Sequence, residues 1–200
     1  VMNKAMKWGK ELFEFRILET ILMCGVLFLI CSLNLYIKIK GEIMKIQEIK
    51  SNKVNDSYFK INHDSGLTIY LYPKKDYNSK YAIFGTRYGS VNNAFSLDGE
   101  EKIKVPDGIA HYLEHKLFES EDGDAFTRYA VTGASANAYT SFDRTCYLFS
   151  CSDKFYDNFE ILLDFVQHPY FTAKTVEKEQ GIIGQEIRMY DDSPSWRVLF

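Results

Sequence analysis

The sequence predicts an α+β fold in which helices cover an antiparallel sheet. Strand patterns occupy residues 67–72 and 81–88, and helical apolar spacing occupies residues 154–167 and 175–190. Runs of strands followed by helices favour helices on one face of an antiparallel sheet. With 46% hydrophobic and 16% aromatic residues, a chain of 200 residues has ample material for a core.

The predicted strands come in two groups. Residues 67–72 and 81–88 are rich in β-branched and aromatic side chains, and they predict strands around a turn at Pro73. Residues 134–149 predict a hairpin, with a strand of small residues, a turn and a second, more apolar strand. The hairpin lies between the helical segments in the chain.

Three segments predict helices. The first follows Pro106, which discourages an earlier start, and Asp107 is its expected N-cap. Residues 154–167 have helical apolar spacing and are closed by Pro169. Residues 175–190 form the last expected helix.

The first helix carries a motif with metal-binding spacing, His111-Tyr112-Leu113-Glu114-His115. Positions i, i+3 and i+4 share one helix face, so His111, Glu114 and His115 project together. Two neutral imidazoles suit zinc, whose catalytic sites usually take three protein ligands and one water. Glu114 is placed to take a proton from that water. The alternative is a hydrogen-bonded polar cluster in the core, and the motif alone does not decide between them.

Two acidic residues lie on one stripe of the last helix. Glu179 and Glu186 are seven residues apart, which is about 10.5 Å along a helix, so both can hardly bind one ion. We expect one to complete the metal site and the other to support a ligand from behind, and we favour Glu186 as the ligand. The alternative is that Glu177 and Glu179 are ordinary solvated charges beside Lys178, and we favour this alternative for Glu177.

These segments resemble the pitrilysin and insulin-degrading-enzyme family of zinc peptidases, which have an inverted His-x-x-Glu-His motif. The family's later segment carries two glutamates seven apart, and the second binds the metal. Glu186 lies 71 residues beyond His115 and fits that place. The resemblance therefore implies His111, His115 and Glu186 as Zn²⁺ ligands, with Glu114 as the base and Glu179 in support. A bacterial branch shares three blocks within roughly residues 60 to 200: GIAHYLEHKLFE, GASANAYTSFDRTCYLFS and EKEQGIIGQEIRMYDDSP.

The small residues from Ala134 to Thr140 leave one strand surface bare. An edge strand of this kind can accept a peptide as an added strand, through backbone hydrogen bonds. In the resembled family this strand holds substrate beside the zinc, so Asn137 and Ala138 are the substrate-contact candidates. The alternative is plain packing, in which small residues let the zinc helix approach closely.

The resemblance implies a zinc metalloendopeptidase that hydrolyses peptides or small unfolded polypeptides through a zinc-activated water. It also implies a second peptidase-like domain or a homologous subunit as partner. The alternative is a non-catalytic peptidase-like subunit that assists assembly, modification or maturation of proteins. Some members of the bacterial branch are associated with modification of elongation factor P.

The net charge, the cysteines and the histidines outside the motif exclude some classes of function. A formal net charge of −3 without a long basic run gives no electrostatic footprint for nucleic acid, so nucleic acid is not an expected partner. The four cysteines form no CxxC pair and are expected to be reduced packing residues. His63 and His168 lack ligand-like neighbours and are not expected to bind metal.

Residues 1–43 look foreign to the peptidase domain, which we expect to occupy residues 44–200. Residues 20–37 carry no charge over 18 positions, which meets the minimum for a membrane-spanning helix. A single-pass membrane anchor and a natural translation start at Met44 are equally supported, and a buried accessory helix is a third interpretation. Lysines flank both ends, so the positive-inside rule gives no orientation. We expect a cytoplasmic peptidase domain, with or without a single N-terminal membrane anchor, and the sequence leaves the orientation of such an anchor undetermined.

The last residues, from Arg188 to Phe200, contain no helix stop and no polar tail. We therefore expect the peptidase domain to be truncated at this end.

Overall fold

The computed structural model describes most of the chain after residue 35, and these residues form two compact units, 36–78 and 79–199. The predicted segment 20–37 lies outside the described residues except for its last two, which belong to a strand. No helix in the described part is long and apolar enough to cross a membrane. The predicted division between residues 43 and 44 stays a prediction. The described ranges are 36–39, 42–63, 65–74, 76–96, 101–121 and 123–199.

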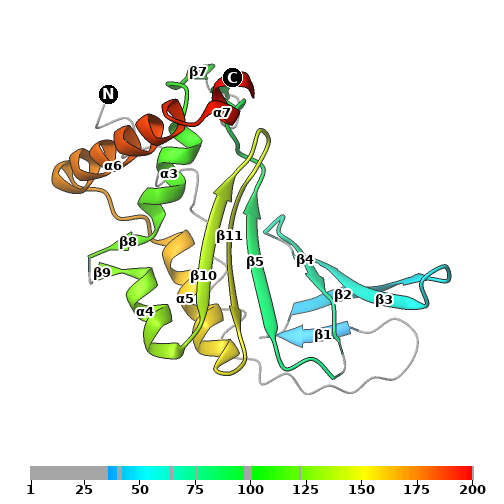
Figure 1. Cartoon of the computed structure of the whole chain (residues 1–200). Helices are drawn as coiled ribbons and strands as arrows, with labels where there is room; N and C mark the ends of the chain where they lie inside the picture. The colour runs from blue at the N-terminus through cyan, green and yellow to red at the C-terminus, as the bar shows by residue number, and fades with distance from the viewer. Residues whose placement is uncertain are drawn as a thin grey trace. The chain divides into compact units, whose positions relative to one another are not determined.

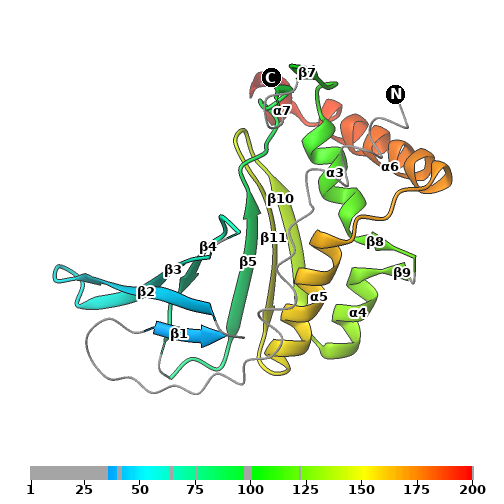
Figure 2. The same ribbon diagram turned by 180° about the vertical axis from the view of Figure 1, so that it is seen from behind.

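The first unit is an antiparallel sheet with the strand order β1-β2-β3-β4 (Figures 1 and 2). Its register places Ile46 opposite Ile61 and Ile61 opposite Ile69, so three isoleucines line one face. Ile46 and Ile61 are buried there, as the two-residue side-chain period of a strand requires. The strands are β1 (Tyr36–Ile39), β2 (Glu42–Ser51), β3 (Asp56–Asn62) and β4 (Thr68–Leu71).

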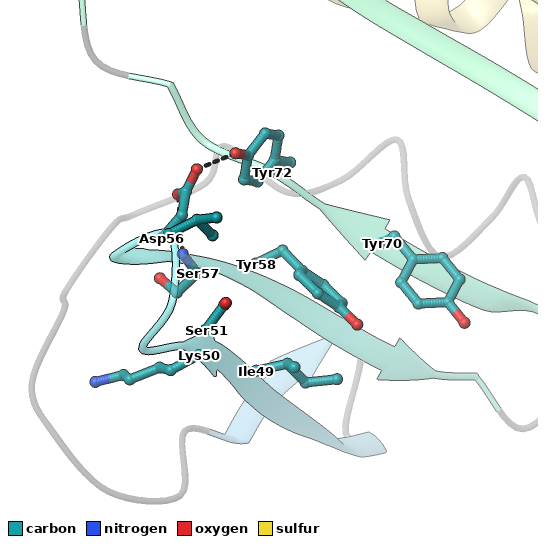
Figure 3. A pocket seen from close by; sticks show the side chains of 9 residues that line it. Ile49, Lys50, Ser51, Asp56, Ser57, Tyr58, Tyr70 and Tyr72 are labelled. Carbon is teal, nitrogen blue, oxygen red and sulfur yellow. Dashed lines mark hydrogen bonds between the residues drawn. The ribbon is translucent and has the colours of Figure 1, made fainter.

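A tyrosine-lined hollow lies on this unit (Figure 3). Tyr58 and Tyr70 lie side by side within it, with ring centroids 6.0 Å apart. At one end, Tyr72 donates a hydrogen bond to Asp56, and Lys74 Nζ lies 2.6 Å from the same carboxylate. Hydrogen bonds from Lys74 and Tyr72 lower the pKa of Asp56 to about 2, so this carboxylate is charged at neutral pH.

The second unit is built on an antiparallel sheet with the order β10-β11-β5. Helices α3, α4 and α5 lie on one side of this sheet (Figure 1). The elements are β5 (Lys80–Thr86), α3 (Ile109–Leu117), α4 (Ala125–Thr132), β10 (Ser135–Thr140), β11 (Thr145–Cys151) and α5 (Phe155–Gln167). Their buried side chains form one core: Leu117, Phe118, Ala125, Tyr129, Tyr147, Phe149, Cys151, Ile161, Leu162, Phe165 and Val166.

Helix α6 (Ala173–Asp191) follows α5 and packs on α3, and α7 (Pro194–Leu199) follows it. Thr172 caps α6: its hydroxyl accepts from the Thr175 backbone N–H, and the Thr175 hydroxyl accepts from that of Thr172. This reciprocal pair satisfies two backbone donors that a helix start leaves unpaired. Two short ladders complete the described part of the unit: β6 (Ala94–Phe95) with β7 (Ile103–Lys104), and β8 (Glu119–Ser120) with β9 (Gly123–Asp124).

The backbone of Gly89 packs closely against the hairpin turn of residues 141–144. A Cβ atom on Gly89 would lie 2.4 Å from Arg144 N and 2.5 Å from Ser141 O, so only glycine fits there. The backbone N–H groups of Ser90 and Val91 donate to the carbonyls of Ser141 and Phe142. The segment after β5 therefore packs directly on the turn.

The mixed fold of helices and antiparallel strands is confirmed, with three corrections. The strands predicted around Pro73 form as β4 and β5, but β4 pairs with β3 and β5 pairs with β11. Gly108, with φ 81°, precedes the first residue of α3, whereas the carboxylate of the expected cap, Asp107, accepts a hydrogen bond from Asn93. Helix α4 was not predicted, because it spans only eight residues.

Candidate metal centre

Helix α3 buries its apolar side chains, together with Glu114 and Lys116, and leaves the two motif histidines partly exposed. Ala110, Leu113 and Leu117 are buried, whereas the two motif histidines keep about a third of their side-chain surface exposed, 35% for His111 and 27% for His115. Their rings lie edge to face, with centroids 4.7 Å apart. The i, i+4 spacing therefore places both imidazoles at one partly open site.

Glu186 of α6 completes a group that could hold a metal ion. Its Oε2 atom lies 3.6 Å from Nε2 of His111 and 3.6 Å from Nε2 of His115. One ligand atom from each of the three residues lies within 4.8 Å of the others. Two ligands about 2.05 Å from a tetrahedral zinc ion are separated by roughly 3.3 Å, so this spacing fits zinc with little adjustment. The predicted set is thus brought together.

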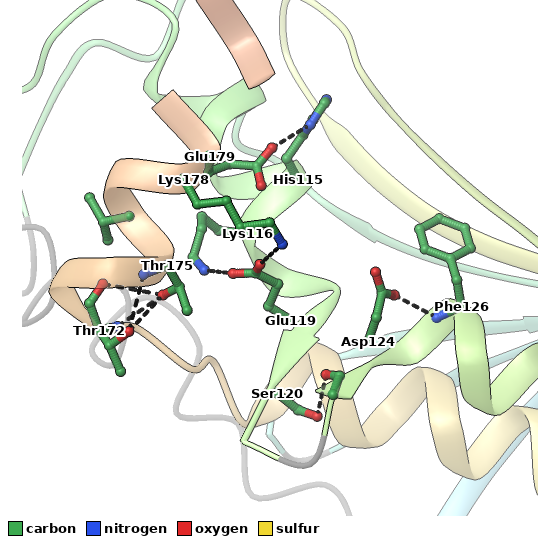
Figure 4. A network of polar contacts seen from close by, with 12 residues as sticks. His115, Lys116, Glu119, Ser120, Asp124, Phe126, Thr172, Thr175, Lys178 and Glu179 are labelled. Atoms are coloured by element: carbon green, nitrogen blue, oxygen red, sulfur yellow. Dashed lines mark hydrogen bonds and ion pairs between the residues drawn. The ribbon is translucent and has the colours of Figure 1, made fainter. Parts of the chain in front are cut away.

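Glu179 contacts the ring of His115 (Figure 4). Its Oε1 atom is 2.9 Å from His115 Nδ1, and Glu179 is buried with 5% of its surface exposed. A carboxylate can only accept, so His115 donates from Nδ1 and keeps the Nε2 lone pair for a metal. This is the supporting position predicted for Glu179.

Glu114 is held by a contact that the sequence did not reveal. The hydroxyl of Thr140, at the end of β10, donates to Glu114 Oε2 at 2.9 Å. Glu114 itself is buried, with 8% of its surface exposed. The Thr140 oxygen is also 3.5 Å from the hydroxyl of Thr145, which donates to the Tyr88 carbonyl. The predicted base is therefore fixed against the end of the edge strand.

Strand β10 is an edge of its sheet, since β11 lies on one side and no described strand of this unit lies on the other. Ala138 packs toward the core, and Asn137 is exposed. The side chain of Asn137 accepts a hydrogen bond from the backbone N–H of Ala138 at 2.9 Å. Contact of Asn137 and Ala138 with substrate stays a prediction.

The remaining sequence predictions can be placed as well. Glu177 is exposed on α6. Among the described residues, neither His63 nor His168 belongs to a group that could hold a metal: His63 contacts Ser65, and His168 contacts Asp164. The two described cysteines, Cys146 and Cys151, are free and buried, as expected.

The fold and this geometry define a candidate metal centre, with two histidines and a glutamate on one helix and two glutamates on another. Residues 101–199 match the family described as Insulinase (Peptidase family M16). The chain therefore carries a domain of the insulinase family, peptidase family M16.

Known relatives agree with this placement. The chain is 54% identical over 156 residues to YmfH of Bacillus subtilis (strain 168), named an uncharacterized zinc protease; this covers 78% of the chain and 36% of YmfH. It is 32% identical to insulin-degrading enzyme-like 2 of Arabidopsis thaliana, over 79% of the chain and 16% of that protein. It is also similar to a solved M16-like peptidase from Alicyclobacillus acidocaldarius, with a TM-score of 0.64 and 44% identity, over 77% of this chain and 33% of that one. The chain thus spans about a third of the length of its bacterial relatives.

Proposed function

We propose that the chain is the metal-binding part of a zinc metalloendopeptidase that hydrolyses peptides or small unfolded polypeptides. The observation that supports this most is the meeting of His111, His115 and Glu186 at the spacing of a tetrahedral ion. The names of relatives as zinc proteases agree with it. The proposed ligand set leaves one position of a tetrahedral ion free for water.

The residues of the chain have distinct parts in the proposed reaction. When bound, zinc polarises the scissile carbonyl and makes a water acidic enough to attack at neutral pH. Glu114 takes up the proton that the attacking water loses and passes it to the leaving amine nitrogen. Its own carboxylate is oriented by the Thr140 hydroxyl, and Glu179 fixes the ring of His115.

Peptide binding follows from the edge position of β10. An extended peptide that pairs with this strand gains backbone hydrogen bonds with little demand on its sequence. Because Thr140 of the same strand contacts Glu114, a peptide added along β10 would run close to the base. Folded proteins lack a free extended segment, so unfolded chains are the proposed substrate class.

Zinc content tests the metal site directly. We expect about one zinc ion per chain in the wild type and much less in Glu186→Gln at equal folding. Glu177→Gln is the matched control, because Glu177 lies on the same helix and is exposed. A folded wild type without zinc, or equal zinc loss in the two variants, would refute the proposed site.

Cleavage of an unstructured peptide tests the chemistry. Glu114→Gln should keep its zinc and lose cleavage by at least about a hundredfold, because the general base is gone. If Glu114→Gln cleaves as well as the wild type, the proposed role of Glu114 is wrong. A wild type that binds zinc and cleaves nothing would instead support the non-catalytic peptidase-like subunit.

A further inference from the structure

Helix α6, which carries Glu186, is held mainly by polar contacts. Of its nineteen residues, all of them described, Glu179 alone is buried. Ile182, Ile187 and Met189 are exposed, and Val176 and Ile183 are only half-buried. Most helices keep their place by burying an apolar face, and α6 has little of that stabilisation from the residues that the structure describes.

Besides the contacts of Glu186 with the two motif histidines, three polar contacts join α6 to α3 and its immediate continuation. The Tyr112 hydroxyl donates to the Val176 carbonyl at 2.9 Å, and His115 contacts Glu179. The third contact is made by Lys178, whose Nζ lies 2.8 Å from Glu119 Oε1 (Figure 4). All three lie in the N-terminal half of α6, whereas Glu186 lies farther along it.

Glu119 is the central group of the third contact. Its second carboxylate oxygen accepts from Lys116, whose side chain is completely buried with 0% exposed. A buried ammonium group requires a charged partner, and Glu119 provides one. Burial raises the pKa of Glu119, but hydrogen bonds from Lys116 and Lys178 outweigh it and hold this pKa below its ordinary value. The carboxylate is therefore charged at neutral pH and binds both lysines.

The ion pair between Lys178 and Glu119 lies where it can influence the position of Glu186. Lys178 and Glu186 are eight residues apart, which is about 12 Å along a helix. If this contact were lost, α6 could tilt about the two remaining contacts, at Val176 and Glu179, and a tilt of roughly 10° would move Glu186 by about 2 Å. Metal sites require ligand distances within about 0.2 Å, so such a tilt would remove Glu186 from the ion.

We propose that Glu119 is a positioning residue of the metal site. It bridges Lys116 of α3 to Lys178 of α6, and so holds α6 where Glu186 reaches the two histidines. This role rests on the proposed zinc site, and it is a role that neither the His-x-x-Glu-His motif nor the distal glutamates specify.

A double-mutant cycle on zinc affinity tests the role. The zinc dissociation constant is measured by competition with a chromophoric chelator for the wild type, Glu119→Gln, Glu186→Gln and the double variant. We expect Glu119→Gln to raise the constant about tenfold or more. It should have no further effect in the Glu186→Gln background, because it acts through Glu186.

Cobalt(II) in place of zinc adds a spectroscopic readout. The visible spectrum of cobalt-loaded Glu119→Gln should resemble that of Glu186→Gln, because both lose the same ligand. A general loss of stability would not produce that particular spectrum.

Two further variants separate positioning from folding. Lys178→Met removes the ion pair between Glu119 and Lys178, whose side chain is 63% exposed, and leaves Lys116 paired with Glu119, so this variant should fold. It should raise the zinc dissociation constant about two- to fivefold. Lys178→Arg should restore the wild-type value. Arg128→Met is the matched control, because it breaks an ion pair with Asp164 that joins α4 to α5 and does not involve α6. It should leave zinc affinity unchanged.

The outcomes distinguish this role from the proposed function. If the folded wild type binds no zinc, both are overturned. If the wild type binds zinc but Glu119→Gln has no effect, or the same effect with and without Glu186, the positioning role alone is overturned. Equal zinc affinity in Lys178→Met and wild type would also overturn it.

Discussion

The hydrogen bond between Thr140 and Glu114 is the feature we would perturb first, by Thr140→Val. Valine keeps the β-branched shape of threonine and removes the hydroxyl that donates to Glu114 Oε2. Because the volume hardly changes, the loss of stability reports the hydrogen bond. The comparison variant is Thr140→Ser, which keeps the hydroxyl and removes a methyl group.

The expected magnitude follows from burial. A hydrogen bond to a charged group contributes about 1.5 to 3 kcal/mol, and its loss leaves the acceptor unpaired. Glu114 is 8% exposed but Thr140 is only half-buried, so we expect about 1.5 kcal/mol for Thr140→Val. A fully buried methyl contributes about 0.8 kcal/mol, so Thr140→Ser should lose roughly half of that at this half-buried position.

The assay is urea unfolding of the metal-free protein in a chelator, followed by far-UV circular dichroism. The same pair of variants is measured in a Glu114→Gln background, where the acceptor is neutral. The effect of Thr140→Val should fall by about half there, because charge-assisted hydrogen bonds are roughly twice as strong as neutral ones. If Thr140→Val destabilises the protein no more than Thr140→Ser does, the hydroxyl does not hold the base, and this reasoning is refuted.

Three further predictions concern stability. Gly89→Ala should lower the free energy of unfolding by about 1 to 3 kcal/mol, because its Cβ would meet backbone atoms at 2.4 to 2.6 Å. Gly181→Ala, whose Cβ would meet nothing within 4 Å, should raise the free energy of unfolding by up to about 1 kcal/mol. Thermal melts of both variants check this, and equal melting temperatures would contradict it. The pKa of Glu119 is lower in the folded chain than its ordinary value of 4.5, so the stabilisation that Glu119 contributes is complete above pH 4.5 and is lost as pH falls through the folded pKa. The free energy of unfolding, measured by urea unfolding at several pH values, should therefore depend less on pH in this range for Glu119→Gln than for the wild type. Phe149→Ala should lower the free energy of unfolding by about 3 to 5 kcal/mol, since the ring is fully buried, and urea unfolding that shows less than 1 kcal/mol would disagree.

Local spacing explains which parts of the site could be predicted from sequence. His111 and His115 share a helix, so their proximity follows from the geometry of a single element. Glu179 and Glu186 likewise lie two turns apart on one face, and the structure brings each to a histidine. The hairpin of β10 and β11 also follows from local pattern, because its strands are neighbours in the chain.

Contacts between distant segments explain what sequence could not give. Thr140 and Glu114 are 26 residues apart, and Glu119 and Lys178 are 59 apart, so neither contact has a periodic signature. The pairing of β5 with β11 rather than β4 is of the same kind. Local patterns predict strands well, but the choice of partner depends on which faces the helices cover.

The three ligand atoms at the metal centre belong to residues that are unequally spaced along the sequence. Two belong to one short helix, and the third belongs to Glu186, which follows His115 by 71 residues. An ion held by all three would join α6 to α3, and it would stabilise this arrangement because the three ligands come together only in the folded chain. The metal would thus hold α6 against α3, so that its removal loosens α6 first while the sheet and its core remain folded. The rate of amide hydrogen exchange along α6, measured with and without zinc, would then report whether the metal centre is occupied, and it would do so without any assay of peptide cleavage.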